Sequence, residues 1–147
     1  YGSGIGSGKG AEGNTDIHIT NSDVTAKGFI VGYVNQGTGI GSGINSSGKT
    51  TIDISGGTVK ATGGGDGYKG SAGIGSGSYS TGDTSITLRD GVTVTATGGG
   101  DSSLGGGGGA GIGSGQWQHH HPHRGCNKSY RYRRLHRCGH RLRPLCR

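Results

Sequence analysis

The chain has 147 residues, of which 38 are Gly, 27% are hydrophobic and 5% are aromatic, and its formal net charge is +7. This low apolar content excludes a thick globular core, and the absence of any apolar run of about 18 residues predicts no membrane span. The averages combine two unlike segments that meet near Gly115. Residues 1–115 hold six Lys and Arg against all eight Asp and Glu, a balance of −2, whereas residues 116–147 hold nine Lys and Arg and no acid, a balance of +9.

The cysteines separate the two segments in the same way, because Cys126, Cys138 and Cys146 all lie in residues 116–147. A Cys-free, faintly acidic segment rich in Gly, Thr, Ser and Ile fits a secreted or cell-surface protein held by backbone hydrogen bonds. No signal-peptide pattern is present. The chain contains no Met and opens inside a repeat at Tyr1, so we expect that a true N-terminus, with any localisation signal, is missing.

Residues 1–115 are built from a repeat. The phrase Gly-Ile-Gly-Ser-Gly begins at Gly4, Gly39, Gly73 and Gly111, at spacings of 35, 34 and 38 residues, which is a period typical of repeat architectures. Between these marks, each copy contains two short segments in which apolar and polar residues alternate, separated by Gly-Gly or Asp-Gly steps that predict turns. In chain order the expected strands are 16–19 and 24–28, 51–54 and 59–63, and 85–88 and 94–98.

The alternation predicts that Ile17, Ile19, Val24, Ala26 and their counterparts in later copies point inward, with polar side chains outward. One copy buries too few side chains to offset its ordering entropy, so the copies are expected to stack and share one core. We therefore predict an all-β repeat solenoid over residues 1–115, a parallel right-handed β-helix. The Gly-rich segments 63–65 and 105–109 are expected to form loops that leave the stack. A bundle of polyproline II helices is the alternative, but Ile-x-Ile breaks the Gly period that it needs.

Residues 116–147 resemble a metal or nucleic-acid module, with a His run at 119–121 and interleaved Arg and Tyr at 130–134. The composition changes abruptly, however, directly after the fourth Gly-Ile-Gly-Ser-Gly. Compatible codons read in a neighbouring frame restore Ile-x-Ile, Val-Thr-Ala-Thr-Gly-Gly and a fifth Gly-Ile-Gly-Ser-Gly in order. We therefore predict that this tail is a disordered, non-native frameshift product, with no metal site and no specific nucleic-acid partner.

One phosphate-site motif is present, because residues 43–50 read Gly, four residues, then Gly-Lys-Thr. Such a site needs a helix after the loop, whose amide groups cradle the phosphate. Here Lys49 and Thr50 run into an expected strand, so we predict that the motif binds no phosphate.

Carboxylates near turns raise the possibility of Ca²⁺ bound by side chains and loop carbonyls, but turn chemistry is the better account, and no cofactor is expected. Paired Asp residues recur nowhere and His18 is expected to point into solvent, so no catalytic residue is assigned and the protein is expected not to be an enzyme. The carboxylates considered are Asp53, Asp66, Asp83, Asp90 and Asp101.

The outward residues of the second strand in each copy make the candidate binding site. Stacked together, they predict a polar β-sheet face that binds extended polymers by hydrogen bonding, with ordinary solvated surface as the alternative. Sugar binding usually adds aromatic platforms, for which Tyr33, Tyr68 and Tyr79 are the candidates. The stripe comprises Asp23, Thr25, Lys27, Thr58, Lys60, Thr62, Thr93, Thr95 and Thr97, and the residues predicted to bind ligand are Thr58, Lys60, Thr62, Thr93, Thr95 and Thr97.

The phrases at residues 57–64 and 72–77 resemble the repeats of large secreted bacterial surface proteins. More remotely, residues 1–115 are similar to bacterial carbohydrate-binding β-helix domains. The resemblance carries over no individual residue, but it implies an extracellular or cell-surface protein whose partners are polysaccharide or cell-wall glycan and the neighbouring repeats of a longer parent chain.

We therefore expect a non-enzymatic structural or adhesive segment. One alternative is a fragment of a β-helical polysaccharide lyase or hydrolase, whose catalytic residues would lie outside this chain. Another is an ice-binding solenoid that uses Thr93, Thr95 and Thr97, although charged residues interrupt the Thr rows.

Overall fold

The computed structural model describes residues 2–31, 35–65, 69–100 and 108–115, and within these ranges all regular structure is β, with no helix. This confirms the all-β prediction. The strands are β1 (Ile5–Gly6), β2 (Thr15–Lys27), β3 (Ile30–Val31), β4 (Asn35–Gln36), β5 (Ile40–Gly41), β6 (Thr50–Thr62), β7 (Ile74–Gly75), β8 (Thr84–Leu88), β9 (Val92–Thr97) and β10 (Ile112–Gly113).

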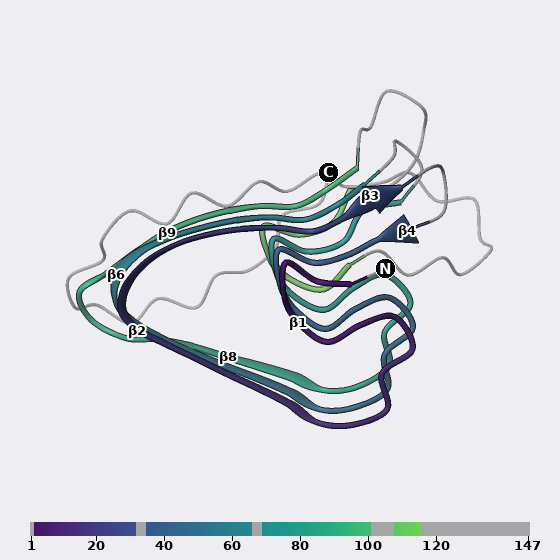
Figure 1. Ribbon diagram of the computed structural model, residues 1–147, viewed down its shortest axis with the longest axis horizontal. Helices are drawn as coiled ribbons and strands as arrows, with labels where there is room; N and C mark the ends of the chain where they lie inside the picture. The colour runs from purple at the N-terminus through teal and green to yellow at the C-terminus, as the bar shows by residue number, and fades with distance from the viewer. Residues whose placement is uncertain (1, 32–34, 66–68, 101–107, 116–147) are drawn as a thin grey trace, which may run out of the picture.

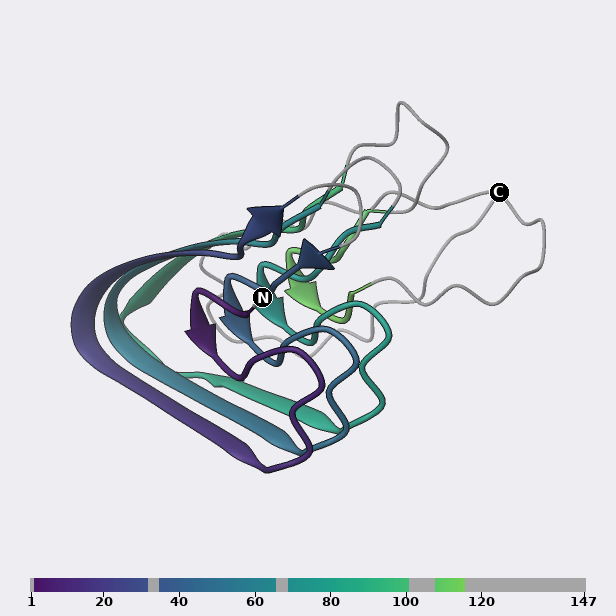
Figure 2. The ribbon, with the colours of Figure 1, turned by 45° about the vertical axis from the view of Figure 1, so that its right-hand side comes forward.

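Equivalent strands of successive copies pair in parallel and in register. We call residues 4–38, 39–72 and 73–110 copies 1, 2 and 3. Strand β2 pairs with β6, and β6 pairs in turn with β8 and β9, so that Ile17 lies beside Ile52, and Ile52 beside Ile86. The copies therefore follow nearly the same path, one behind another, as Figures 1 and 2 show. The predicted ladders of matching apolar residues are confirmed.

The strands are longer than the sequence indicated. Copies 1 and 2 were expected to hold two short strands each, but β2 and β6 each run unbroken for 13 residues around a bend. Positive φ angles at Asn21 (47°), Gly56 (64°) and Gly57 (75°) turn the backbone there, while pairing continues on both sides of the bend. Only in copy 3 does the expected turn at Asp90 and Gly91 separate two strands, β8 and β9.

The Gly-Ile-Gly-Ser-Gly marks are strands themselves, which the sequence did not indicate. They form a parallel sheet in the order β1-β5-β7-β10, which aligns Ile5, Ile40, Ile74 and Ile112. The residue after each Ile is a Gly with φ between 129° and 137°, a conformation that side chains disfavour. These glycines let the backbones of neighbouring copies approach closely.

The core has an apolar half and a hydroxyl-lined half. Ile40, Ile52, Ile54, Val59 and Ile74 are fully buried, as the alternation predicted for the residues of the long strands. The other half, which the sequence did not reveal, packs small hydroxyl side chains that bond to backbone. Thr38 Oγ1 donates to Ser42 O (3.0 Å), and Ser78 Oγ donates to Gly70 O (3.0 Å). The buried hydroxyl residues are Thr38, Ser42, Ser46, Thr50, Ser71, Ser76, Ser78 and Ser80.

Strand β3 pairs antiparallel with β4, a contact that the sequence did not indicate. The first Gly-rich segment, 63–65, was expected to leave the stack, but Gly63 and Gly64 stay in it. The Gly63 N–H donates to Thr97 O of copy 3 and the Gly64 N–H donates to Gly37 O of copy 1, both at 2.8 Å, while Gly65 forms an isolated antiparallel bridge with Gly70. Residues 105–107, part of the second expected Gly-rich loop, lie outside the described ranges.

Replacing Thr84 with Val is expected to stabilise the fold by about 1 kcal/mol, because Thr84 Oγ1 is buried without a hydrogen-bond partner among the described residues. Valine has nearly the same shape, so the change removes an unsatisfied polar atom and opens no cavity. Chemical denaturation followed by circular dichroism measures the difference. As the control, Thr38→Val removes a satisfied hydroxyl and is expected to destabilise; a loss of stability in both variants would contradict the prediction.

Candidate binding face

The nine stripe residues lie together on one side of β2, β6 and β9. We call this set the outer face. In register it forms three ladders, each running through copies 1, 2 and 3, and every member is exposed except Thr62, which is half-buried. All six residues predicted to bind ligand are therefore neighbours. The ladders are Asp23–Thr58–Thr93, Thr25–Lys60–Thr95 and Lys27–Thr62–Thr97.

The outer face is a lattice of hydroxyl groups with two repeat distances. Paired strands lie about 4.8 Å apart, and outward residues along one strand are about 6.6 Å apart. Thr side chains occupy six of its nine positions. Such a lattice offers donors and acceptors at regular intervals, which suits a polymer that repeats its own hydroxyl groups.

The outer face carries a net charge of +1, from Lys27 and Lys60 against Asp23. Asp23 Oδ1 accepts a hydrogen bond from the Thr58 N–H (3.1 Å), so this carboxylate supports the backbone at the bend. Within the part of the chain that the structure describes, Lys27 and Lys60 form no ion pair. Their ammonium groups are therefore open to a ligand.

An exposed aromatic side chain follows the outer face, and the sequence analysis missed it. Phe29 is 56% exposed and continues the spacing of two residues that runs through Asp23, Thr25 and Lys27. That spacing, extended one step beyond the expected strand, would have found it. Among the aromatic residues proposed from sequence, Tyr79 lies after β7, outside the strands of the outer face, with the Lys69 ammonium 4.9 Å from its ring centroid.

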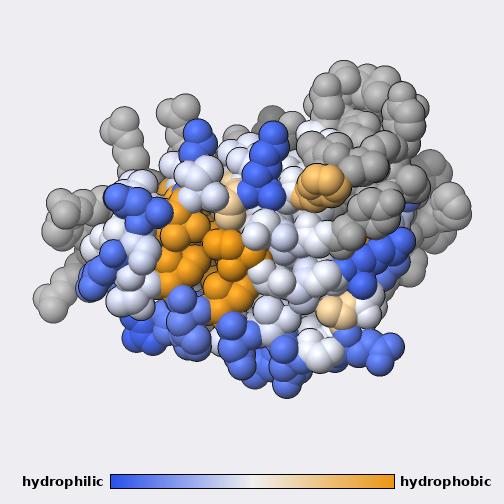
Figure 3. Space-filling view, in the orientation of Figure 1, coloured by the Kyte–Doolittle hydropathy of each residue, from blue (hydrophilic) through white to orange (hydrophobic). Residues whose placement is uncertain are grey.

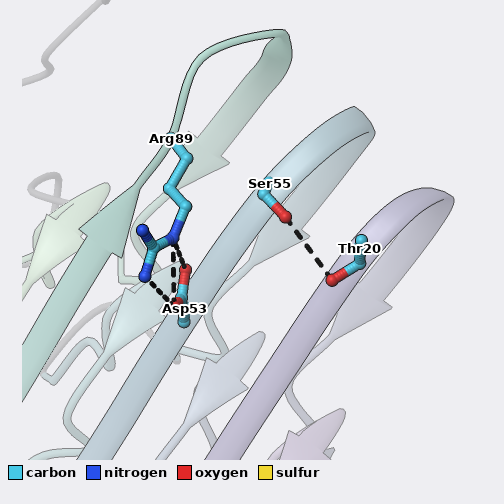
Figure 4. Close-up of polar contacts among 4 residues, drawn as sticks. All are labelled: Thr20, Asp53, Ser55 and Arg89. Carbon is cyan, nitrogen blue, oxygen red and sulfur yellow. Dashed lines mark hydrogen bonds and ion pairs between the residues drawn. The ribbon is translucent and has the colours of Figure 1, made fainter.

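The outward residues before the bend in β2 and β6 make polar contacts between copies, as Figure 4 shows for Thr20, Asp53, Ser55 and Arg89. Arg89 binds Asp53 through two nitrogens, with Nη2–Oδ2 at 2.7 Å and Nε–Oδ1 at 2.9 Å. The hydrogen bonds from Arg89 lower the pKa of Asp53 below its ordinary value. Ser55 Oγ donates to Thr20 Oγ1 at 3.4 Å. Asp53 is thus held by a cation of the next copy, and His18, in the same ladder as Asp53, is exposed as expected.

The phosphate-site motif has the context that the sequence predicted. Thr50 begins β6, and no helix follows in the described ranges. Backbone amides of the motif are already hydrogen-bonded to copy 1, because the Gly43 N–H donates to Ser7 Oγ (3.1 Å) and the Lys49 N–H donates to Asn14 Oδ1 (3.1 Å). Thr50 N–H in turn donates to Asp83 O (2.8 Å). This segment stacks copies and offers no phosphate cradle.

Several sequence predictions lie outside the described residues and stay predictions. These concern Tyr33, Tyr68, Asp66, Asp101 and the whole of residues 116–147. Among the residues that are described, no three His, Cys, Asp or Glu side chains gather in a way that could hold a metal ion. The same ranges contain no helix with the length and apolar character that a membrane crossing needs.

Neither a protein-family model, nor a curated protein, nor a solved structure matches this chain.

Proposed function

We propose that copies 1 to 3 form successive turns of a parallel, right-handed β-helix. We also propose that this segment has a non-enzymatic structural or adhesive role in a bacterial surface or secreted protein and binds polysaccharide on its outer face. In-register parallel pairing between copies supports the β-helix. Crossovers between parallel strands of one sheet are nearly always right-handed, which supports the handedness.

The observation that carries the binding proposal is the outer face, where six Thr side chains lie in register with two lysines that form no ion pair among the described residues. A single hydroxyl contact contributes little, because water competes for it. A polymer that spans three strands makes many such contacts at once. Phe29, two residues beyond the end of β2, offers an apolar surface on which a sugar ring can pack.

Charge distinguishes this proposal from ice binding. Asp23, Lys27 and Lys60 interrupt the Thr ladders, and strongly hydrated side chains disturb the regular surface that ice recognition needs. The same lysines favour polysaccharides with anionic groups, because they attract them over a Debye length of about 10 Å.

Glycan-array binding by the full chain tests the proposal. The double variant Lys27→Ala/Lys60→Ala is expected to bind its best glycans about tenfold more weakly, since two charged contacts are lost. Because residues 116–147 carry a +9 balance that attracts polyanions by itself, a matched control is needed. Lys9→Ala/Lys49→Ala removes the same charge from exposed positions outside the outer face and is expected to change binding less than about twofold. Equal losses in both variants would refute the outer face as the site.

A further inference from the structure

Lys60 lies at the centre of the outer face, and all four of its nearest neighbours there are Thr. Thr58 and Thr62 flank it along β6, and Thr25 and Thr95 lie beside it in the strands of copies 1 and 3. These positions are about 6.6 Å from Lys60 along the strand and about 4.8 Å from it across strands. We call the five residues the Lys60 cluster. Copy 2 has a described copy on each side, so described residues occupy every position around Lys60.

The Lys60 cluster faces solvent. Four of its side chains are exposed, and Thr62 is half-buried. Within the part of the chain that the structure describes, these side chains form no hydrogen bond or ion pair. In the orientation of Figure 1, apolar residues gather inside the bend and hydrophilic residues lie along its margin, as Figure 3 shows. The cluster therefore offers one ammonium group and four hydroxyl groups to a ligand.

The one acid of the outer face does not neutralise Lys60. Asp23 lies diagonally from Lys60, and its carboxylate accepts a hydrogen bond from the Thr58 N–H (3.1 Å) instead. Before the bend, the corresponding central charge of β6 is neutralised, because Arg89 of copy 3 binds Asp53 with Nη2–Oδ2 at 2.7 Å (Figure 4). Among the described residues, the stack thus supplies a counter-ion for the central charge before the bend and none for the one after it.

We propose that the Lys60 cluster is a subsite for a uronic acid residue within an otherwise neutral, hydroxyl-rich polysaccharide. This inference rests on the proposed function and names its substrate class. The carboxylate of the uronic acid accepts a charge-assisted hydrogen bond from the Lys60 ammonium. Hydroxyl groups of the same sugar and of its neighbours bond to the four Thr side chains. Lys27, on the diagonal in copy 1, offers a second charged contact about 8 Å from the first.

The arrangement of charge disfavours two other classes of polymer. A polymer with an anion on every sugar, or with many sulfate groups, places most of its charges over Thr hydroxyls or beside Asp23, where little compensates their loss of water. A neutral polymer covers the Lys60 ammonium without giving it a partner. A polymer whose carboxylates are separated by neutral sugars meets both requirements.

A polysaccharide array probed with the full chain tests the proposal. Glucuronoxylan and gellan carry carboxylates separated by neutral sugars, polygalacturonate is charged on every sugar, and dextran sulfate carries dense sulfate. Each carboxylated polymer is printed in its native form and in a carboxyl-reduced, neutral form. Carboxyl reduction of glucuronoxylan or gellan is expected to weaken binding about tenfold, because the charged contact is lost while the hydroxyl contacts stay.

Lys60→Thr assigns this difference to one residue. It completes a surface of Thr alone, so it should weaken binding to the native polymer about tenfold and bring it level with the carboxyl-reduced form. As the matched control, Lys49→Thr makes the same change at an exposed position outside the outer face and should alter binding less than about twofold. Residues 116–147 attract dense polyanions, so binding to dextran sulfate should not depend on Lys60.

The outcomes separate this inference from the proposed function. If carboxyl reduction leaves binding unchanged, or if Lys60→Thr acts most strongly on polygalacturonate or dextran sulfate, the substrate class is wrong while the outer face stays the site. If neither Lys60→Thr nor the Lys27→Ala/Lys60→Ala variant changes binding to any polymer, the proposed function fails and this inference fails with it.

Discussion

Gly41→Ala is expected to destabilise the fold by at least about 4 kcal/mol, a large part of the roughly 5–15 kcal/mol by which a typical domain is stable. Gly41 has a φ of 135°, and a Cβ placed on it would lie 1.8 Å from the Gly75 carbonyl oxygen of the next copy. A side chain there suffers both backbone strain and a clash with backbone that cannot rotate away. Urea denaturation followed by far-UV circular dichroism measures the loss.

Two other glycines of the chain separate these effects. Gly10 has a φ of 69° but nothing within 4 Å of an added Cβ, so Gly10→Ala isolates the strain and should cost about 1 kcal/mol. Gly13 has neither a positive φ nor a neighbour within 4 Å, and Gly13→Ala should be nearly neutral. If Gly41→Ala is no worse than Gly10→Ala, close approach between copies does not stabilise this sheet.

These glycines show where the sequence stops predicting the fold. Ile17, Ile52 and Val59 were placed inward correctly because alternation with period two reports burial directly. The Gly-Ile-Gly-Ser-Gly phrase shows no such alternation of apolar and polar residues, and Gly weakens an isolated strand. It forms β5 and β7 only because another copy lies against it, which is a tertiary cause that local patterns do not contain.

The bend and the surface charges also depend on contacts between copies. Gly56 and Gly57 were correctly associated with a change of direction. Whether strand pairing stops there depends on the neighbouring copy, and β2 bends at the matching position, Asn21, so the pairing continues. The outer face followed from alternation alone. The pairing of Asp53 with Arg89 joins residues 36 positions apart in neighbouring copies, so sequence could not separate this held carboxylate from the unpaired lysines of the outer face.

The loss of stability on truncating a core side chain should depend on the position of its copy in the stack. The ladder Ile19–Ile54–Leu88, a column of equivalent residues from copies 1, 2 and 3, tests this. Ile54 is fully buried between neighbours on both sides, so Ile54→Ala is expected to cost about 3–5 kcal/mol. Leu88 is 38% exposed in copy 3, and Leu88→Ala should cost about 1 kcal/mol. Urea denaturation of both variants at low protein concentration provides the comparison, and equal costs would contradict a core shared between copies.

Ile19, in copy 1, is the third member of this column. It is 8% exposed and has one ladder neighbour, Ile54, among the described residues, so Ile19→Ala should cost less than Ile54→Ala. Urea denaturation of the two variants side by side checks this order, and equal losses would contradict it.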